Sequence, residues 1–387
     1  MNSSEIFSNY GLIGDNLELK KDIKILISES GNFKSISYKN VGDTIQLSDN
    51  NSNLLLVPGL INSHIHIGDS FAKEQGFNRA LKSVVAPPNG IKHLLFNVTS
   101  KEEIIKGIKK AILELLSNGI TFFIDFREGE IDGLKVLYEA IEREKIIDSL
   151  ILGRFRQKEE IKKIFQLADG IGLPSYKAIY PEVKEILRKC KAVSGKIVAC
   201  HVAELKRNNS LINQIFNDNI VDIFIHGTQF IKKDLKLLVQ KNKALILCPR
   251  CNGYFGAGFP PITNIIKLKI PLAIGTDNVM ANNPDLFEEL RYLYRILRVM
   301  DKNIKVTGKD LLKMVTINAA KIFNVESRIG SISEGKNANF FIIDLNNPNY
   351  YTPKLNIDTF YALIIGRTNS FNIKKTYVRG KLVHEKH

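Results

Sequence analysis

Short apolar segments alternate along the chain with longer segments whose apolar residues recur every three or four positions. A short apolar run predicts a buried strand, and recurrence at three and four predicts a helix that packs by one face. Strands are expected on this basis at residues 54–67, 120–126, 149–155, 170–175, 196–203, 222–228, 244–249 and 271–277. The expected helices between them cover residues 101–117, 132–143, 158–168, 181–193, 210–217 and 232–240, with a weaker one at 263–268.

Eight strand–helix pairs in about 240 residues match the size of a closed (β/α)₈ barrel, and the main alternative is a doubly wound open sheet. In a barrel the carboxyl ends of all strands converge on one mouth, where the chemistry gathers. The expected strand ends carry polar residues, namely His64, His66, Arg127, Arg154, His201, His226 and Asp277. This placement favours a TIM-type barrel over residues 54–329.

The two ends of the chain have a different pattern. Residues 1–53 and 330–387 contain short alternating runs, such as residues 23–27 and 340–344. Alternation of period two is typical of strands that bury one face. We therefore expect a small β-sandwich domain that is assembled from both termini.

The composition is that of an ordinary globular protein. Of 387 residues, 44% are hydrophobic and 25% are charged, which allows a large core. No stretch approaches the roughly 18 uninterrupted apolar residues of a membrane helix, and the first ten residues lack a basic segment followed by an apolar one. We therefore expect a cytoplasmic protein without a membrane partner. Four cysteines are too few for a disulfide framework, so reduced thiols are expected.

The formal net charge of +15 raises the question of an anionic partner. The 55 Lys and Arg residues are scattered, and no basic stripe with interleaved aromatic residues occurs. Scattered lysines usually form a solvated surface, whereas nucleic-acid binders concentrate their basic groups. The charge therefore predicts no nucleic-acid partner.

The pair His64-x-His66 ends the first expected strand. Side chains two apart on a strand point to the same side, so both imidazoles can share a cation. His201-Val-Ala-Glu204 ends the fifth strand. Taken singly, each motif could instead be a core histidine or a surface carboxylate.

Two further strand ends carry His226 and Gly275-Thr-Asp277. A lone Asp at a strand end is often only a helix cap. The chain has seven histidines, however, and four of them fall on the same expected face. Three imidazoles, one carboxylate and an open position for water form the ligand set of a catalytic zinc or a similar divalent ion.

These motifs together resemble the amidohydrolase superfamily, specifically its branch of aromatic and nucleobase deaminases and chlorohydrolases. The resemblance extends to Thr316-Ile-Asn-Ala-Ala320 and to Gly330-Ser-Ile-Ser-Glu-Gly-Lys336, and covers nearly the whole chain. It implies that His64, His66, His201 and Asp277 bind one divalent metal ion, with Zn²⁺ expected and Fe²⁺ or Mn²⁺ as alternatives.

The resemblance also implies the catalytic roles. Glu204 would shuttle protons, His226 would hydrogen-bond the attacking hydroxide or the developing oxyanion, and Asp277 would orient the hydroxide. Relatives with two metals often use a modified lysine at the end of strand four. Here Lys177 lies beyond that strand, so we expect one metal. Relatives are often dimers or larger, which implies a homo-oligomer.

The expected activity is hydrolytic deamination of an amino-substituted N-heterocycle, a nucleobase, nucleoside or related small molecule, with release of ammonia. Hydrolysis of a cyclic amide or of a carbon–halogen bond on the same scaffold is an alternative, and a catalytically silent metal-binding protein is another. The spacing of Cys248 and Cys251 would also allow a redox or zinc motif, although the pair follows a buried strand and does not open a thioredoxin-like helix.

Basic groups near the mouth suggest that the substrate carries an acidic group, because arginine grips carboxylate or phosphate at two points. The residues expected to bind substrate are His93, Arg127, Arg154, Arg250 and Asn278. The alternative is that these arginines pair with neighbouring carboxylates such as Asp125, Glu128 and Glu130. Long segments at 69–97 and 251–262 are candidates for walls of the substrate site or a lid.

Overall fold

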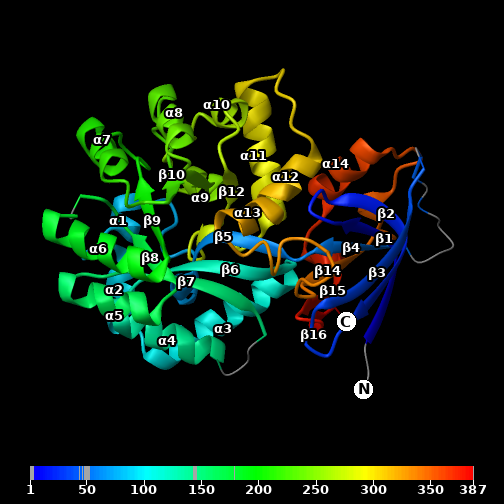
Figure 1. Ribbon diagram of the computed structural model, residues 1–387, viewed down its shortest axis with the longest axis horizontal. Coiled ribbons are helices and arrows are strands. Elements are labelled where there is room, and N and C mark those ends of the chain that lie inside the picture. The colour runs from blue at the N-terminus through cyan, green and yellow to red at the C-terminus, as the bar shows by residue number, and fades with distance from the viewer. Residues whose placement is uncertain are drawn as a thin grey trace.

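Two β-sheets organise the protein. The computed structural model describes residues 4–42, 44–45, 47, 53–142, 146–177 and 179–386. One sheet is parallel and surrounded by helices, and the other is built from both ends of the chain (Figure 1). In the described ranges no helix is both long and apolar enough to cross a bilayer.

The parallel sheet has the strand order β12-β11-β10-β9-β8-β7-β6-β5-β13. Its strands are β5 (Leu60–His66), β6 (Ile120–Arg127), β7 (Asp148–Gly153), β8 (Gly170–Leu173), β9 (Ile197–Val202), β10 (Ile223–His226), β11 (Ala244–Leu247), β12 (Leu272–Ile274) and β13 (Asp277–Asn278). The expected strands are all present, in chain order around the sheet.

β12 and β13 are two halves of one final strand that closes the barrel. β12 pairs with β11, while β13 pairs with β5. Between the halves, Asn62 donates to Thr276 Oγ1 at 2.7 Å and accepts from Thr276 N at 3.1 Å. Gly275 is required here, because a Cβ at this position would lie 2.5 Å from His64 N. The sheet is therefore a closed (β/α)₈ barrel.

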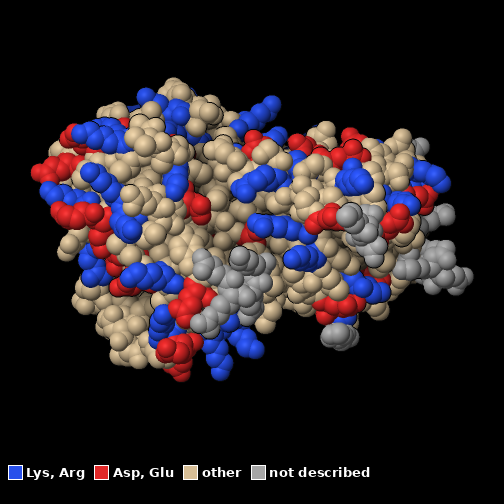
Figure 2. Space-filling view, turned by 60° about the horizontal axis from the view of Figure 1, so that its bottom comes forward, with Lys and Arg blue, Asp and Glu red and all other residues tan. Residues whose placement is uncertain are grey.

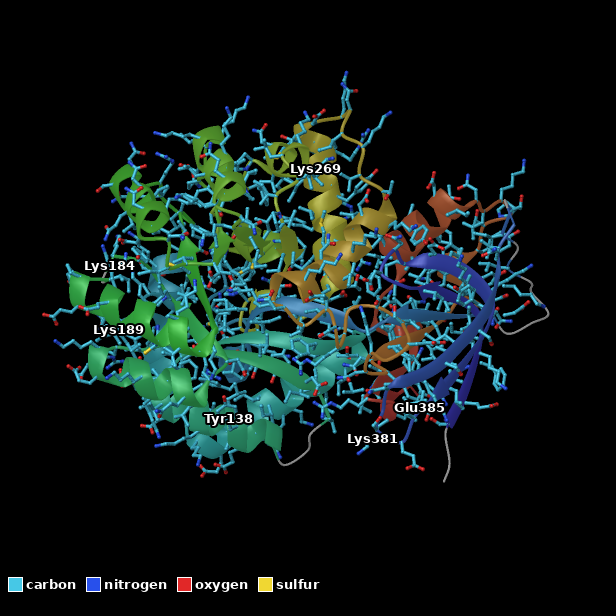
Figure 3. The ribbon with its side chains drawn as sticks, viewed as in Figure 1. Tyr138, Lys184, Lys189, Lys269, Lys381 and Glu385 are labelled. Carbon is cyan, nitrogen blue, oxygen red and sulfur yellow. The ribbon has the colours of Figure 1, made fainter. Side chains whose placement is uncertain are left out.

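Helices cover the outside of the barrel (Figure 1). They are α3 (Lys101–Ser117), α4 (Glu130–Glu142), α5 (Ile161–Leu167), α6 (Pro181–Ser194), α7 (Asn209–Asp218), α8 (Lys232–Gln240), α10 (Ile262–Lys267), α11 (Leu286–Met300), α12 (Gly308–Met314) and α13 (Ile317–Ile322). In α3, for example, Ser100 caps the N-terminus, and Ile104, Ile108 and Leu115 are buried. The opposite faces carry charged side chains, such as the exposed Lys189 of α6, which is labelled in Figure 3.

The two segments expected as long loops contain short helices. The segment after β5 forms η1 (Ile67–Ala72), α1 (Leu81–Val85) and α2 (Ile91–Val98), and the segment after β11 begins with α9 (Pro249–Tyr254). A one-turn 3₁₀-helix, η2 (Lys158–Glu160), precedes α5. The short helices after β5 and β11 show no clear helical period in the sequence, whereas η2 and α5 together occupy the helix expected at residues 158–168.

The terminal segments form a seven-stranded sheet in the order β16-β15-β14-β4-β1-β2-β3. The strands are β1 (Ser4–Ile13), β2 (Glu18–Ile27), β3 (Phe33–Asn40), β4 (Leu54–Pro58), β14 (Phe340–Asp344), β15 (Ile373–Val378) and β16 (Lys381–Glu385). The connections include η3 (Pro348–Tyr350), α14 (Ile357–Arg367) and η4 (Ser370–Asn372). The sheet curls over one core, since Phe33 of β3 and Phe340 of β14 approach to 5.9 Å between ring centroids.

The strand expected at residues 54–67 is divided between the two sheets. β4 belongs to the terminal sheet, and β5 belongs to the barrel. The break lies at Gly59, whose missing Cβ would come within 2.0 Å of Thr121 Oγ1. Both halves are buried, so the apolar run continues through the boundary. The chain thus passes directly from the terminal sheet to the strand that carries His64 and His66.

Lys and Arg side chains are interspersed with Asp and Glu over the face of the molecule shown in Figure 2, as their scatter along the sequence led us to expect.

Candidate metal centre

A bulge in β5 aims His64 and His66 into the barrel mouth. Ile61 belongs to the core inside the barrel, whereas Ile65 belongs to the core between strands and helices. The alternation reverses between them because the register against β6 shifts between Asn62 and Ile65. A bulge of this kind redirects side chains beside a functional site. As a result both imidazoles face inward, with ring centroids 5.0 Å apart.

His201 joins this pair from β9. Its ring centroid lies 4.8 Å from that of His64 and 5.6 Å from that of His66. His201 Nδ1 lies 3.0 Å from Leu173 O, and His66 Nδ1 lies 2.9 Å from Phe126 O and 2.8 Å from Glu128 Oε1. Each of these Nδ1 atoms can donate its proton to an oxygen, so Nε2 is the nitrogen that remains for a cation.

Asp277 brings the carboxylate to the three imidazoles. Its Oδ1 lies 3.3 Å from His64 Nε2 and 3.4 Å from His66 Nε2, and its Oδ2 lies 3.9 Å from His226 Nε2. Asp277 and His226 both adopt left-handed backbone conformations, with φ of 63° and 70°. Non-glycine residues in this region cluster at functional sites, where the surrounding fold holds them.

The left-handed conformation explains how His226 reaches the site. Ile223 and Ile225 of β10 point into the barrel interior. Regular alternation would direct the next side chain outward. Instead, His226 is buried at the mouth, and its ring centroid lies 5.3 Å from that of His201.

The residues fit a divalent cation. One ligand atom from each of His64, His66 and His201 lies within 4.8 Å of the others, and the same holds for His64, His226 and Asp277. Both ring nitrogens of His64 are buried without a hydrogen-bond partner, although Nε2 lies close to Asp277. Histidines that bind metals commonly donate their other N–H to a carbonyl or carboxylate, as His66 and His201 can do here. Nitrogen with carboxylate oxygen is a donor set suited to zinc.

The protonation states also suit a metal. Burial lowers the pKa of His66 to about 4, with Glu128 acting in the opposite direction. Burial and the neighbouring imidazoles lower the pKa of His201 well below its usual value. Burial alone would raise the pKa of Asp277, but His64, His226 and His66 hold it well below its ordinary value. His66 and His201 are therefore neutral and the Asp277 carboxylate is ionised at neutral pH.

Glu204 lies beside this cluster, where the chain turns away after β9. Its Oε1 lies 3.5 Å from His226 Nε2, and the preceding Ala203 has a φ of 52°. Burial, and then the Asp277 carboxylate, raise the pKa of Glu204 to about 8. A carboxyl group with such a pKa can both give and take a proton near neutral pH.

A cavity of about 690 Å³ opens above these residues. Its walls include His66, His201, Glu204, His226, Asp277 and Asn278, together with Arg154, Lys177 and residues of α1. Lys177 is exposed, and it belongs to neither of the potential ligand groups in the described part of the chain. Of the residues expected to bind substrate, Arg154 and Asn278 line the cavity.

Arg127 lies elsewhere, contrary to the expectation that it binds substrate. Its buried guanidinium covers Gly68, donates to Glu128 O at 3.1 Å and to Glu128 Oε2 at 3.3 Å, and lies 3.8 Å from Asp125 Oδ2. A Cβ on Gly68 would occupy the position of this group. Arg127 thus packs behind the site and pairs with carboxylates, which was the alternative.

Arg250 and His93, which were also expected to bind substrate, do not line the cavity. Arg250 is paired with Glu288 at 2.8 Å and donates to Asn283 Oδ1 at 2.5 Å, because α9 carries it towards the start of α11. His93 is half-buried on α2, and its Nε2 lies 3.1 Å from Val85 O. Their polar groups are therefore engaged within the protein.

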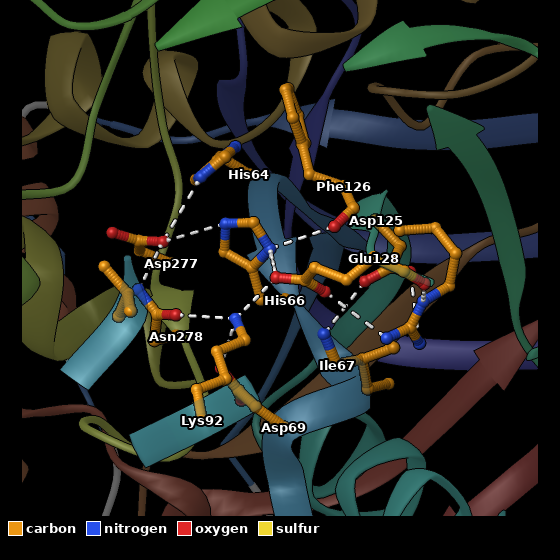
Figure 4. A network of polar contacts seen from close by, with 12 residues as sticks. His64, His66, Ile67, Asp69, Lys92, Asp125, Phe126, Glu128, Asp277 and Asn278 are labelled. Atoms are coloured by element: carbon orange, nitrogen blue, oxygen red, sulfur yellow. Dashed lines mark hydrogen bonds and ion pairs between the residues drawn. The ribbon is translucent and has the colours of Figure 1, made fainter. Parts of the chain in front are cut away.

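A network of buried charges behind His66 was not expected from the sequence (Figure 4). Glu128 approaches His66 and Lys92, and Lys92 also approaches Asp69 and Asn278. Glu128 directly follows a strand and was interpreted only as a partner for the arginines, while Lys92 lies on α2, far along the chain from the strand that carries His66. Asp69, three residues after His66, was the available signal for a carboxylate beside the site.

The cysteines contribute no disulfide. Cys248 and Cys251 are buried free thiols, and burial raises the pKa of each well above its usual value. Cys251 Sγ lies 3.7 Å from Asn278 Nδ2. This environment does not favour a reactive thiolate.

Comparisons with known proteins all indicate the same family. The model of the amidohydrolase family matches residues 55–383. A provisionally named aminohydrolase of Methanothermobacter thermautotrophicus is 31% identical over 388 residues, covering 95% of this chain and 96% of the relative. A 5′-deoxyadenosine deaminase of Methanococcus maripaludis is 27% identical over 373 residues, covering 86% of this chain and 83% of the relative.

Among solved structures, an adenosine deaminase from Xanthomonas campestris with bound zinc is similar, with a TM-score of 0.79 at 17% identity, covering 98% of this chain and 92% of that one. This likeness shows the shared barrel fold. From the family match over most of its length, the chain belongs to the amidohydrolase family and is a hydrolase for carbon–nitrogen bonds other than peptide bonds.

Proposed function

We propose that this hydrolase removes the amino group from a small N-heterocycle and releases ammonia. The observation that carries the proposal is the position of Glu204, whose carboxyl group lies 3.5 Å from His226 and faces the cavity beside the imidazole cluster. The similarity to a 5′-deoxyadenosine deaminase supports the same reaction class.

We propose His64, His66, His201 and Asp277 as the ligands of one divalent cation, with Zn²⁺ preferred and Fe²⁺ or Mn²⁺ as alternatives. The zinc in the similar adenosine deaminase supports this preference. Such a cation, when bound, lowers the pKa of water towards about 7 and supplies hydroxide at neutral pH.

In the proposed reaction, a water oxygen bonds to the ring carbon that carries the amino group, and the exocyclic carbon–nitrogen bond breaks. One water proton goes to the adjacent ring nitrogen, and the other leaves with ammonia. Glu204 can carry both protons in turn, because its pKa of about 8 places both of its forms within reach at neutral pH. His226 is buried and neutral, so its Nε2 can hydrogen-bond the oxygen that develops charge.

The cavity wall favours a substrate with an acidic group. Arg154 follows β7 and lines the cavity, and its Nε is buried without a hydrogen-bond partner. Burial lowers the pKa of Arg154 while Glu128 and Glu130 act in the opposite direction, and the group stays charged because its ordinary pKa is so high. A cation that lines the cavity with an unpaired N–H is suited to a carboxylate or phosphate. We therefore propose Arg154 as the residue that binds this group.

A screen for ammonia release tests the function. Nucleobases, nucleosides, nucleotides and pterins would be offered to protein loaded separately with zinc, iron or manganese. We expect ammonia from at least one aminated heterocycle. A ring-opened acid or halide without ammonia would instead identify the cyclic amide hydrolase or the chlorohydrolase. Zinc binding with no turnover of any compound would contradict the proposal.

A further inference from the structure

Lys92 is a buried lysine whose ammonium lies within 3 Å of three oxygen atoms from different residues. Its Nζ lies 2.5 Å from Glu128 Oε1, 2.9 Å from Asp69 Oδ2 and 2.9 Å from Asn278 Oδ1. The side chain is 2% exposed. The ammonium donates a hydrogen bond to Asn278 and forms ion pairs with Glu128 and Asp69. Lys92 therefore borders the cavity with its charge already paired within the protein.

Two of these acceptors lead directly to candidate metal ligands (Figure 4). The oxygen of Glu128 that meets Lys92 also lies 2.8 Å from His66 Nδ1. The amide of Asn278 accepts from Lys92 through Oδ1 and donates through Nδ2 to Asp277 Oδ1 at 2.9 Å. A single residue thus separates Lys92 from each of these ligands: Glu128 lies between Lys92 and His66, and Asn278 lies between Lys92 and Asp277.

These two branches end on opposite sides of the seam that closes the barrel. His66 lies on β5 and pairs in register with Asn278 on β13. Lys92 itself comes from α2, in the segment that follows β5. A single ammonium group therefore links the first and the last strand of the barrel at the level of the metal centre.

We propose that Lys92 is a positioning residue that sets the geometry of His66 and Asp277 for metal binding. The inference rests on the metal site proposed above. With Oδ1 of Asn278 held by Lys92, Nδ2 must face Asp277, which fixes the rotation of the Asp277 carboxylate. His66 Nδ1 hydrogen-bonds Phe126 O and also lies 2.8 Å from Glu128 Oε1, so Lys92, by holding Glu128, keeps a second partner of this ring in place and Nε2 of His66 facing the centre. Outer partners of this kind typically change metal affinity by about 10- to 100-fold.

A purely structural role is the alternative. Lys92 also offsets two buried carboxylates, Asp69 and Glu128, and loss of a buried cation can destabilise a protein without any effect on a nearby site. The two roles differ in what they change in protein that has folded. A structural role alters the unfolding midpoint, whereas a positioning role also alters metal affinity and ligand geometry.

The test compares Lys92→Met with the unaltered protein by zinc competition against a chelator and by the visible spectrum after loading with Co²⁺. We expect zinc affinity to fall about 10- to 100-fold and the Co²⁺ spectrum to change. Lys191→Met is the matched control, because Lys191 also pairs with a carboxylate, 2.5 Å from Asp222 Oδ1, but it lies on α6 outside the cavity wall. The control should keep the zinc affinity and the spectrum of the unaltered protein.

Asn278→Leu covers the case in which Lys92→Met does not fold. This change cuts the branch to Asp277 and leaves both ion pairs of Lys92 intact, so zinc affinity should fall while the fold persists. Where both variants fold, their effects on zinc affinity should be less than additive in the double variant, because both interrupt the branch to Asp277. Fully additive effects would overturn the proposal.

Folded Lys92→Met with unchanged zinc affinity and an unchanged Co²⁺ spectrum would also overturn it, as would unchanged affinity in Asn278→Leu when Lys92→Met is unfolded. These measurements of zinc affinity and of the Co²⁺ spectrum need no substrate. They therefore test the role of Lys92 even if the ammonia screen finds no activity. If the unaltered protein binds no zinc, the metal site itself is wrong, and the role of Lys92 is wrong with it.

Discussion

Asp277 and His64 stand on the two strands that close the barrel, with Asp277 Oδ1 3.3 Å from His64 Nε2. The other candidate ligands, His66 and His201, come from the first and the fifth barrel strands. This arrangement of donors exists only when the barrel has closed. A cation that binds the folded chain and not the unfolded chain must therefore stabilise the closed barrel.

Removal of the metal should consequently lower the thermal unfolding midpoint. At free zinc about 1,000 times the dissociation constant, the stabilisation is about 4 kcal/mol. With a shift of about 2 °C per kcal/mol for a large domain, the midpoint should fall by about 8 °C on chelation. Calorimetry with and without chelator measures this shift. Re-addition of zinc is the control, and an unchanged midpoint in chelator would contradict a metal bound by these residues.

Much of the candidate site could be predicted because strand ends in a parallel barrel meet at one mouth. The structure brings His64, His66, His201, His226 and Asp277 together there. Their assignment to a metal remains a prediction. The bulge in β5 and the left-handed conformation of His226, which orient these side chains, leave no pattern in a single sequence.

The roles of Arg127 and Glu128 could not be predicted, for a specific reason. Both end β6 or directly follow it, and both are polar residues at the expected mouth. A strand end gives the level of a side chain in the barrel but not its direction. Arg127 turns towards Gly68 and away from the cavity, while Glu128 turns towards His66. The division of the expected strand into β4 and β5 at Gly59 could not be predicted either, because the apolar run continues through that position.

Glu204→Gln should lower the turnover number by about 10²- to 10⁴-fold, the usual contribution of general acid–base catalysis. The amide keeps the shape of the side chain but cannot carry a proton. Zinc content should stay at that of the unaltered protein, because Glu204 belongs to neither potential ligand group in the described residues. Steady-state kinetics and metal analysis check both statements. Glu185→Gln, an exposed change on α6, is the control and should keep full activity. Normal turnover by Glu204→Gln would show that another group moves the protons.

Arg154→Met should selectively weaken the binding of substrates with an acidic group. A hydrogen bond between charged groups contributes about 1.5–3 kcal/mol, which corresponds to a rise in KM of about 10- to 150-fold. A neutral analogue should show little change. Arg156→Met is a matched control, since Arg156 follows the same strand but is 77% exposed and pairs with Glu130 at 3.8 Å. Equal losses for acidic and neutral substrates would argue that Arg154 supports the cavity wall and does not bind an anion.

The pH dependence of stability in the metal-free protein tests the protonation state of Glu204. Burial, and then Asp277, raise its pKa from 4.5 to about 8, so the folded state holds a proton that the unfolded state releases above about pH 4.5. The resulting stabilisation is complete below that pH and is lost as the pH rises through about 8.

The free energy of unfolding from this group should therefore fall between pH 5 and 8, by at most about 1.4 kcal/mol per pH unit. Glu204→Gln does not titrate, so the slope of its unfolding free energy against pH should be more positive than that of the unaltered protein over the same range. Urea unfolding in chelator measures both slopes, and the other titrating groups cancel in the difference. Identical slopes would mean that Glu204 is already ionised in the folded metal-free protein, and its pKa would then not be raised towards 8.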